Sequence, residues 1–156
     1  MPKETILILD KEYQSQYALK TLLEAEEYIV VAVDTMDRAV QNVSEFVVSG
    51  LITEYSVDYS RTLEKVRELK KKSPETYVMM ITDHEVVDSE YQEIIEAGVD
   101  DFFLKPLSAG KILLHLRKGL RQRLICLQKK RLEQELNYLK RKRRFGNIEQ
   151  GNETYP

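Results

Sequence analysis

The sequence predicts an α/β fold in which a parallel sheet carries helices on both faces and is followed by a long C-terminal helix. Three observations support this prediction. Short apolar runs rich in β-branched residues alternate five times with helical patterns. Several of the runs are apolar at consecutive positions, as in strands buried on both faces. The last helical pattern is longer than one small sheet can cover. With right-handed crossovers, the expected architecture is a doubly wound, three-layer sandwich.

The first two strand-and-helix units occupy residues 5–45. Thr5–Leu9 is an apolar run that ends at Asp10 and predicts a strand buried on both faces. From Tyr13 onward, apolar residues recur at helical spacing, which predicts a helix that packs one stripe on the sheet. Tyr28–Val33 is a second β-branched run. Thr35–Glu45 follows it with a weaker helical pattern.

The next three strands occupy residues 46–104. Phe46–Thr53 predicts the third strand, and Tyr59–Lys72 predicts the helix after it. Thr76–Ile81 predicts the fourth strand. A short helix follows and closes at Gly98, a residue type suited to the left-handed position after a helix. Asp101–Leu104 predicts the last strand.

The fifth helix is expected to be much longer than the others. Ser108 is a suitable N-cap, and apolar residues continue at steps of three and four toward Arg144. This stripe consists of Ile112, Leu113, Leu116, Leu120, Leu124, Leu127, Leu132, Leu136 and Leu139. About 35 helical residues span roughly 50 Å, so the second half needs a partner other than the sheet. We expect one domain over residues 1–124, a helical extension over 125–144, and a linker or disordered tail over 145–156, with the helix ending at Phe145-Gly146.

Composition limits the class of protein. A chain of 156 residues with 42% hydrophobic and 32% charged residues fits one soluble domain with a real core plus an appendage. No run approaches the roughly 20 apolar residues of a membrane span, and the N-terminus does not resemble a signal peptide, so we expect a cytoplasmic protein without membrane contact. The single cysteine, Cys126, excludes an internal disulfide framework and a cysteine metal cluster.

The net charge of −2 conceals a strong asymmetry. Residues 1–110 contain 11 Lys and Arg against 22 Asp and Glu, whereas residues 111–156 contain 13 against 4. The balances are −11 and +9. The chain therefore has an acidic body and a basic tail.

Polar residues that could form a site follow the first, third, fourth and fifth predicted strands. In a doubly wound sheet the functional surface lies at the carboxyl ends of the strands. The residues at these ends are Asp10 and Lys11 after the first strand, Glu54 after the third, Thr82 and Asp83 after the fourth, and Lys105-Pro106 after the fifth. The sequence thus predicts a site that combines carboxylates, ammonium groups and a hydroxyl.

The order and spacing of these residues resemble the receiver domain of two-component response regulators, over about residues 4–124. In that family, an acidic pair after strand one holds Mg²⁺, an Asp after strand three accepts a phosphoryl group, a Thr or Ser after strand four binds the phosphate, and a Lys before a Pro pairs with it. The resemblance implies the (βα)₅ flavodoxin-like receiver fold with strand order 2-1-3-4-5. It places Thr82 and Lys105 at the phosphate-binding positions, and Phe102 at the position of a switch aromatic that changes rotamer on activation.

Two residues depart from the family pattern. Glu54 occupies the phosphoacceptor position, and its carboxylate extends one methylene further, which is the wrong geometry for attack on a phosphodonor. Lys11 replaces the second acid of the metal-binding pair and brings a cation to the place of Mg²⁺. We therefore expect weak or absent Mg²⁺ binding, no metal site and no cofactor, with Asp10 alone left as a candidate ligand.

The two departures also compensate each other. The Lys11 ammonium can lie between Asp10 and Glu54 as a counterion, with Lys105 approaching Glu54 from the other side. The alternative is that Lys11 points to solvent. Glu12 belongs to the same acidic pocket and could replace the missing acid.

The basic run Lys140–Arg144 leaves three roles open. It is compatible with a coiled-coil or signalling helix, with non-specific nucleic-acid contact, and with a solvated helix end favoured by the macrodipole. No DNA-reading motif follows it.

We expect a signalling module and not an enzyme: an atypical receiver that works without phosphorylation and uses its C-terminal helix for dimerisation or for coupling to an output. The expected partners are proteins, among them a histidine kinase, an output domain and a second copy of the chain. Non-specific nucleic-acid binding by the basic helix is one alternative. A conventional Mg²⁺-dependent switch phosphorylated on Asp58 is another. His84 and His115 are expected to be surface or packing residues.

Overall fold

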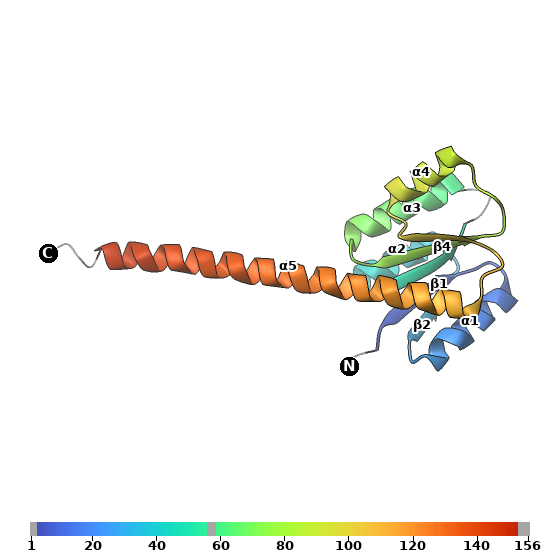
Figure 1. The fold of residues 1–156 in the computed structure, drawn as a ribbon, viewed down its shortest axis with the longest axis horizontal. Coiled ribbons are helices and arrows are strands. Elements are labelled where there is room, and N and C mark those ends of the chain that lie inside the picture. Colours follow the sequence, from blue (N-terminus) through green and yellow to red (C-terminus); the bar gives the residue numbers. More distant parts are fainter. Residues whose placement is uncertain (1–2, 56–58, 153–156) are drawn as a thin grey trace. The chain divides into compact units, whose positions relative to one another are not determined.

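The computed structural model describes residues 3–55 and 59–152 and shows a five-stranded sheet with helices on both faces (Figure 1). The strand order is β2-β1-β3-β4-β5, and every pairing is parallel. The fold predicted from the sequence is therefore confirmed. The elements are β1 (Thr5–Leu9), α1 (Tyr13–Ala25), β2 (Ile29–Ala32), α2 (Met36–Glu45), β3 (Gly50–Glu54), α3 (Tyr59–Lys72), β4 (Tyr77–Thr82), α4 (Asp88–Ala97), β5 (Asp101–Leu104) and α5 (Ala109–Asn152).

The strand register brings the ends of the strands to one edge. Leu9 pairs with Thr53, Glu54 pairs with Ile81, and Thr82 pairs with Leu104. Because the strands are parallel, the residues that follow them enter loops at the same edge of the sheet. This edge is where the sequence places the candidate site.

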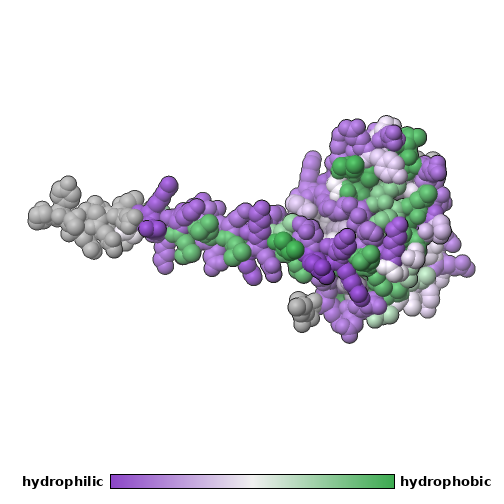
Figure 2. All heavy atoms as spheres, viewed as in Figure 1, coloured by the Kyte–Doolittle hydropathy of each residue, from purple (hydrophilic) through white to green (hydrophobic). Residues whose placement is uncertain are grey.

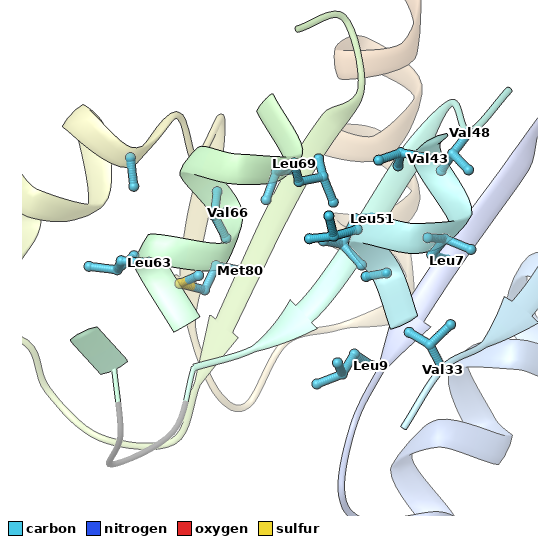
Figure 3. Packing of buried hydrophobic residues seen from close by; sticks show 14 of the residues in the cluster. Leu7, Leu9, Val33, Val43, Val48, Leu51, Leu63, Val66, Leu69 and Met80 are labelled. Carbon is cyan, nitrogen blue, oxygen red and sulfur yellow. The ribbon is translucent and has the colours of Figure 1, made fainter. Parts of the chain in front are cut away.

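Each face of the sheet has its own apolar core. The side chains of one core alternate along β1, β3 and β4 and pack against α2, α3 and α4. The residues labelled in Figure 3 show the part of this core formed by the strands, α2 and α3. The other core joins the opposite face to Leu23 of α1 and to Leu116 and Leu120 of α5. β1 and β4 are buried along almost their whole length, which explains why both strands read as continuous apolar runs.

Gly119 lets α5 approach β4 closely. A Cβ atom at this position would lie 2.8 Å from Cγ of the Tyr77 ring and closer still to Cδ2 and Cε2. Tyr77 is buried, and its hydroxyl donates to the carboxylate of Asp101 on β5. The glycine that interrupts the apolar stripe of the last helix is therefore the contact point for a buried ring.

The helix caps agree with the sequence in two places. The Ser108 hydroxyl accepts a hydrogen bond from the Lys111 amide at 3.2 Å, as expected of an N-cap. Gly98 closes α4 with φ of 100°, the left-handed conformation expected for it.

The start of the third strand was predicted wrongly. β3 begins at Gly50 and not at Phe46, because Phe46 and Val47 form an extended connection in which their side chains are 63% and 78% exposed. Pairing begins only where the Ser49 amide donates to the Thr5 carbonyl. Apolar residue type alone does not separate an exposed connection from a buried strand.

The predicted end of the last helix is also wrong. α5 continues past Phe145-Gly146 to Asn152. One glycine in a helix interior costs about 1 kcal/mol relative to alanine, which weakens a long helix without ending it.

The chain divides into two compact units, Met1–Arg123 and Leu124–Pro156. Both cores lie within residues 6–120, so the first unit has a complete core of its own. In the second unit, apolar side chains are interspersed among hydrophilic ones (Figure 2). Leu132, Leu136 and Leu139 are 64%, 52% and 54% exposed. No described helix is long and apolar enough to cross a membrane.

Candidate functional site

Glu54 is the last residue of β3, and its carboxylate lies between the loop after β1 and the end of β5. Its Oε2 accepts a hydrogen bond from the Lys11 main-chain amide at 3.3 Å. Its Oε1 lies 3.9 Å from Lys105 Nζ. The Glu54 side chain is 20% exposed and the Lys105 side chain 31% exposed, so water still reaches this pair. An ion pair of this length and exposure contributes about 0–1 kcal/mol.

Lys105 is fixed by the sheet as well as by this pair. Its amide donates to the Thr82 carbonyl at 2.7 Å, which continues the β4–β5 pairing one residue beyond β5. The ammonium is thereby directed along the edge of the sheet toward Glu54. The structure thus contains the contact between Lys105 and Glu54 that the sequence suggested.

Lys11 reaches Glu54 in a different way from the one the sequence suggested. Its main-chain N–H makes the contact, and among the described residues no carboxylate lies within 4.0 Å of its ammonium. The side chain is exposed. A long cationic side chain gains little from a pair in water and loses rotamer freedom on forming one. Of the two expectations for Lys11, the solvent-directed side chain is the one that the structure contains.

Asp10 and Glu12 accept hydrogen bonds at the start of α1. The Asp10 carboxylate accepts from the Glu12 amide at 2.9 Å, and the Glu12 carboxylate accepts from the Ser15 hydroxyl at 3.1 Å. The Asp10 bond is a local side-chain turn that satisfies an amide just before the helix. Glu12 is therefore engaged with Ser15 in α1, away from the place of the missing acid.

The donor set at this edge does not fit Mg²⁺. The ion requires near-octahedral oxygen ligation and is bound in proteins by carboxylates. Here the second acid is replaced by Lys11, and both oxygens of Glu54 face N–H groups, one from an amide and one from an ammonium. The residues present are thus suited to holding the Glu54 carboxylate itself.

Thr82 is fully buried at the end of β4, and its hydroxyl is occupied by a neighbour in the chain. Its Oγ1 lies 2.9 Å from Nδ1 of His84 and 3.4 Å from the Tyr55 carbonyl oxygen. Among the described hydrogen bonds, none joins this hydroxyl to the Glu54 carboxylate. The sequence brings Thr82 to the correct edge, but its partner is a histidine that we had expected to be only a surface or packing residue.

His84 also contacts Asp83. Nδ1 lies 3.3 Å from the Asp83 carboxylate, and this hydrogen bond holds the pKa of Asp83 below its usual range. Asp83 is largely exposed, so the effect on stability is small. The only sequence signal for these contacts was the position of His84 two residues after Thr82.

An aromatic column runs from this edge toward α4. The Tyr55 ring stacks on His84 with centroids 5.7 Å apart and meets the edge of Phe102 at 5.7 Å. Phe102 in turn meets Tyr91 of α4 edge to face at 5.5 Å. Phe102 is half-buried and packs against the core, and Tyr55 is 1% exposed. Edge-to-face pairs contribute about 0.5–1.5 kcal/mol beyond burial. Sequence reasoning missed Tyr55 as a member of the site.

A polar cleft of about 270 Å³ lies beside Glu54 and Lys11, at the N-terminal end of α2 and along α3. Asp37 lies at its wall, where its carboxylate is 2.7 Å from Lys65 Nζ and 3.9 Å from Arg61. The hydrogen bond from Lys65 lowers the pKa of Asp37. Asp37, Lys65 and Arg61 therefore lie beside opposite charges in this wall.

Of the remaining residues singled out in the sequence, His115 lies away from the site. His115 packs its ring 4.6 Å from Phe103 on the α1–α5 side of the sheet, in agreement with a packing role. Cys126 is an exposed thiol in the second unit. Asp58 lies outside the described residues.

The comparisons with known proteins agree with this fold. The family model for the response regulator receiver domain matches residues 6–117. The transcriptional regulatory protein ResD of Bacillus subtilis is 24% identical over 117 residues, which are 75% of this chain and 48% of ResD. The chain spans half or less of the length of the first curated relatives that it matches.

Solved receiver structures share the fold at low identity. A CheY-like receiver domain from Methanospirillum hungatei has a TM-score of 0.71 at 19% identity, covering 78% of this chain and 97% of that chain. The beryllofluoride-activated NtrC4 receiver domain dimer has a TM-score of 0.68 at 24% identity, covering 76% of this chain and 98% of that chain. Chains consisting of little more than the matched region therefore form this fold without further domains.

Proposed function

The chain belongs to the response regulator receiver family, and from this premise we propose that it is an atypical receiver whose signalling does not depend on phosphorylation. Receivers of this family are signalling modules in two-component systems. The observation that carries the proposal is the engagement of Glu54, at the phosphoacceptor position, by the Lys11 amide and the Lys105 ammonium. The carboxylate and its partners form a charged unit that needs no phosphoryl group.

Two physical arguments support the loss of phosphotransfer. Positioning and charge stabilisation supply nearly all of the catalysis of phosphoryl transfer, and the longer side chain of Glu54 displaces the attacking oxygen. Lys11 also removes one of the acids that the family uses to hold Mg²⁺, which would otherwise offset the charge of the transferred group.

Glu54 either imitates the phosphorylated acceptor or fixes one conformation through Lys105, and the contacts favour the second role. In the family, the phosphate is bound by the hydroxyl after strand four and by the lysine after strand five. Glu54 contacts Lys105, but the Thr82 hydroxyl is directed to His84. The carboxylate thus reproduces one of the two contacts of a phosphoryl group.

We propose that residues 1–124 form the receiver and that residues 125–144 mediate dimerisation or couple it to an output. The exposed stripe Leu132, Leu136 and Leu139 supports this role, because apolar side chains at steps of three and four are suited to helix pairing. Under this proposal the partners are proteins in the cytoplasm, among them a histidine kinase or an output domain.

Exposure to a small acyl phosphate with Mg²⁺ tests phosphorylation independence. We expect the intact mass of the protein to remain unchanged. The matched control is the double variant Glu54→Asp with Lys11→Asp, which restores both family acids and is expected to gain the mass of one phosphoryl group. A stoichiometric phosphoryl adduct on the unmodified chain would overturn the proposal.

A second candidate function is non-specific nucleic-acid binding by the basic helix. The five consecutive cationic residues Lys140–Arg144, all exposed, favour it. The test is the affinity for duplex DNA and single-stranded RNA as a function of salt, with and without Lys140→Glu and Arg144→Glu. Affinity that falls steeply with salt and is lost in the variant supports this function, whereas no binding at low salt excludes it.

A further inference from the structure

α4 presents an apolar stripe to solvent. Val87, Tyr91 and Ile95 are 60%, 43% and 71% exposed, and they follow one another at intervals of four residues. Residues at this spacing lie on one face of a helix. From the N-cap Val87 to Ile95 the stripe covers eight helical steps, or about 12 Å along the helix axis. It is long enough to pack against two turns of another helix.

The same face is strongly acidic. Residues 73–104 contain nine Asp and Glu and no Lys or Arg. Four of these acids, Glu85, Asp88, Glu93 and Glu96, have exposed side chains, and Asp88 and Glu96 directly follow Val87 and Ile95 of the stripe. Among the described residues, none of these four carboxylates takes part in an ion pair, in contrast to Asp100, which is held by Lys70 at 2.8 Å. The apolar stripe therefore has an uncompensated negative rim.

A complementary helix occurs in the same chain. Residues 129–144 contain eight Lys and Arg against two Glu. Their leucines at positions 132, 136 and 139 are more than half exposed and cover about 10 Å of helix. The cations lie before and after the leucines, at 129–131 and 140–144, so this exposed apolar stripe of similar length has a basic run at each end and complements the stripe on α4 in length and charge.

We propose that the α4 face, defined as Val87, Tyr91 and Ile95 with their acidic rim, binds residues 129–144 of a second copy of this chain. This inference rests on the proposed role of α5 in dimerisation and names the surface that receives it. Packing of the two apolar stripes supplies the attraction that salt does not screen, and the acids on α4 and the basic runs of the tail supply orientation and a salt-dependent attraction. Nucleic acid could meet only the basic half of this pair, because its phosphates are repelled by α4.

The test is the dimer dissociation constant of the full chain, measured by sedimentation equilibrium at about 0.1 M and about 1 M ionic strength, where the Debye length falls from about 10 Å to about 3 Å. Asp88→Lys with Glu96→Lys reverses the charges next to the stripe on α4. We expect it to weaken the dimer at least ~10-fold at the lower salt and less at the higher salt.

Two further variants make the test specific. The matched control, Glu27→Lys with Glu64→Lys, makes the same change in net charge at exposed acids elsewhere and is expected to leave the constant within ~3-fold. The tail variant Lys140→Glu with Arg144→Glu is expected to weaken the dimer like the α4 variant. Combining the tail and α4 variants exchanges the two charges, and we expect recovery to within ~3-fold of the original constant.

The outcomes separate this inference from the proposed function. A full chain that dimerises equally well with and without the α4 variant overturns the α4 contact and leaves dimerisation intact. A full chain that is monomeric at every concentration overturns both. Equal weakening by the α4 and control variants, or failure of the charge exchange to restore binding, also overturns the α4 contact. Loss of DNA binding without loss of self-association in the tail variant would identify nucleic acid as the partner of the basic run.

Discussion

Replacement of Gly119 by alanine tests the close approach of α5 to the sheet. In an open helix this change is stabilising by about 1 kcal/mol, because alanine has the higher helix propensity. At position 119 the added Cβ would lie 2.8 Å from Cγ of Tyr77 and closer to two other ring atoms. Carbon atoms pack best at about 3.5–4.0 Å, so the overlap is about 1 Å or more.

The ring has little room to yield. Tyr77 is 4% exposed, and its hydroxyl is bound to the Asp101 carboxylate. Overpacking of this kind typically costs about 1–3 kcal/mol, more than the propensity gain where neither partner can move. We expect Gly119→Ala to lower the free energy of unfolding by about 1–2 kcal/mol.

Urea denaturation followed by circular dichroism measures the effect, provided that the m-value is unchanged. Gly110→Ala is the matched control, because it lies in the same helix and a Cβ there would meet nothing within 4 Å. It is expected to be neutral or stabilising by up to about 1 kcal/mol. The truncation Tyr77→Ala, which is itself destabilising, should remove the penalty of Gly119→Ala and give a coupling of about 1 kcal/mol or more.

Two results would refute this reasoning. One is a Gly119→Ala protein as stable as the Gly110→Ala protein. The other is additivity of the Gly119 and Tyr77 substitutions, since the coupling must vanish if the ring and the helix backbone are not in contact.

Three further predictions concern single side chains. Burial and the Asp101 hydrogen bond raise the pKa of the Tyr77 hydroxyl, so Tyr77 ionises at lower pH in the unfolded chain, and the free energy of unfolding should fall as pH rises above about 10. Tyr77→Phe should flatten that fall and should cost about 1 kcal/mol of stability at neutral pH. Urea denaturation measures both effects. Lys65 lowers the pKa of Asp37, so the ionised carboxylate stabilises the fold above its unfolded pKa, and this stability is lost as pH falls through the lower folded pKa. The loss of stability caused by Asp37→Asn, measured in thermal melts, should therefore become smaller below about pH 4. Lys105→Met removes the ammonium beside the carboxylate at the end of β3 and should change the free energy of unfolding by less than about 1 kcal/mol, because the pair is partly exposed; a larger loss would mean that it is a major support of the fold.

The sequence predicted the sheet well because the buried strands have a clear pattern. β1 and β4 are apolar at successive positions, and both are enclosed by helices on two sides. The prediction failed at Phe46, where an apolar side chain is largely exposed in a connection. It also failed at Gly146, where local propensity favours an end but the helix continues. At both positions the residue type favours one secondary structure, but the structure that forms depends on the surrounding backbone.

The candidate site was predictable to the level of the backbone. Parallel strands in register deliver Glu54, Thr82 and Lys105 to one edge whatever their rotamers are. The hydrogen bond between Thr82 and His84 and the stacking of Tyr55 depend on side-chain torsions, which no spacing rule fixes. The sequence could therefore indicate which residues meet at the edge, but not how their polar atoms pair.

The contact between Lys11 and Glu54 shows why this distinction affects function. An ammonium between two carboxylates would have made Lys11 a replacement for the metal ion. The contact is instead made by its amide, which any non-proline residue at position 11 would provide. The holding of Glu54 thus depends on the course of the loop after β1 and on Lys105, while the side chain of Lys11 acts by removing an acid. Thr82 is hydrogen-bonded to His84, so the side chains of the aromatic column from His84 through Tyr55 to Phe102 contact the hydroxyl and not the carboxylate. A change at Glu54 therefore reaches Phe102 through the backbone to its neighbour Tyr55, or through Lys105 and the backbone of β5, and not through the Thr82 hydroxyl.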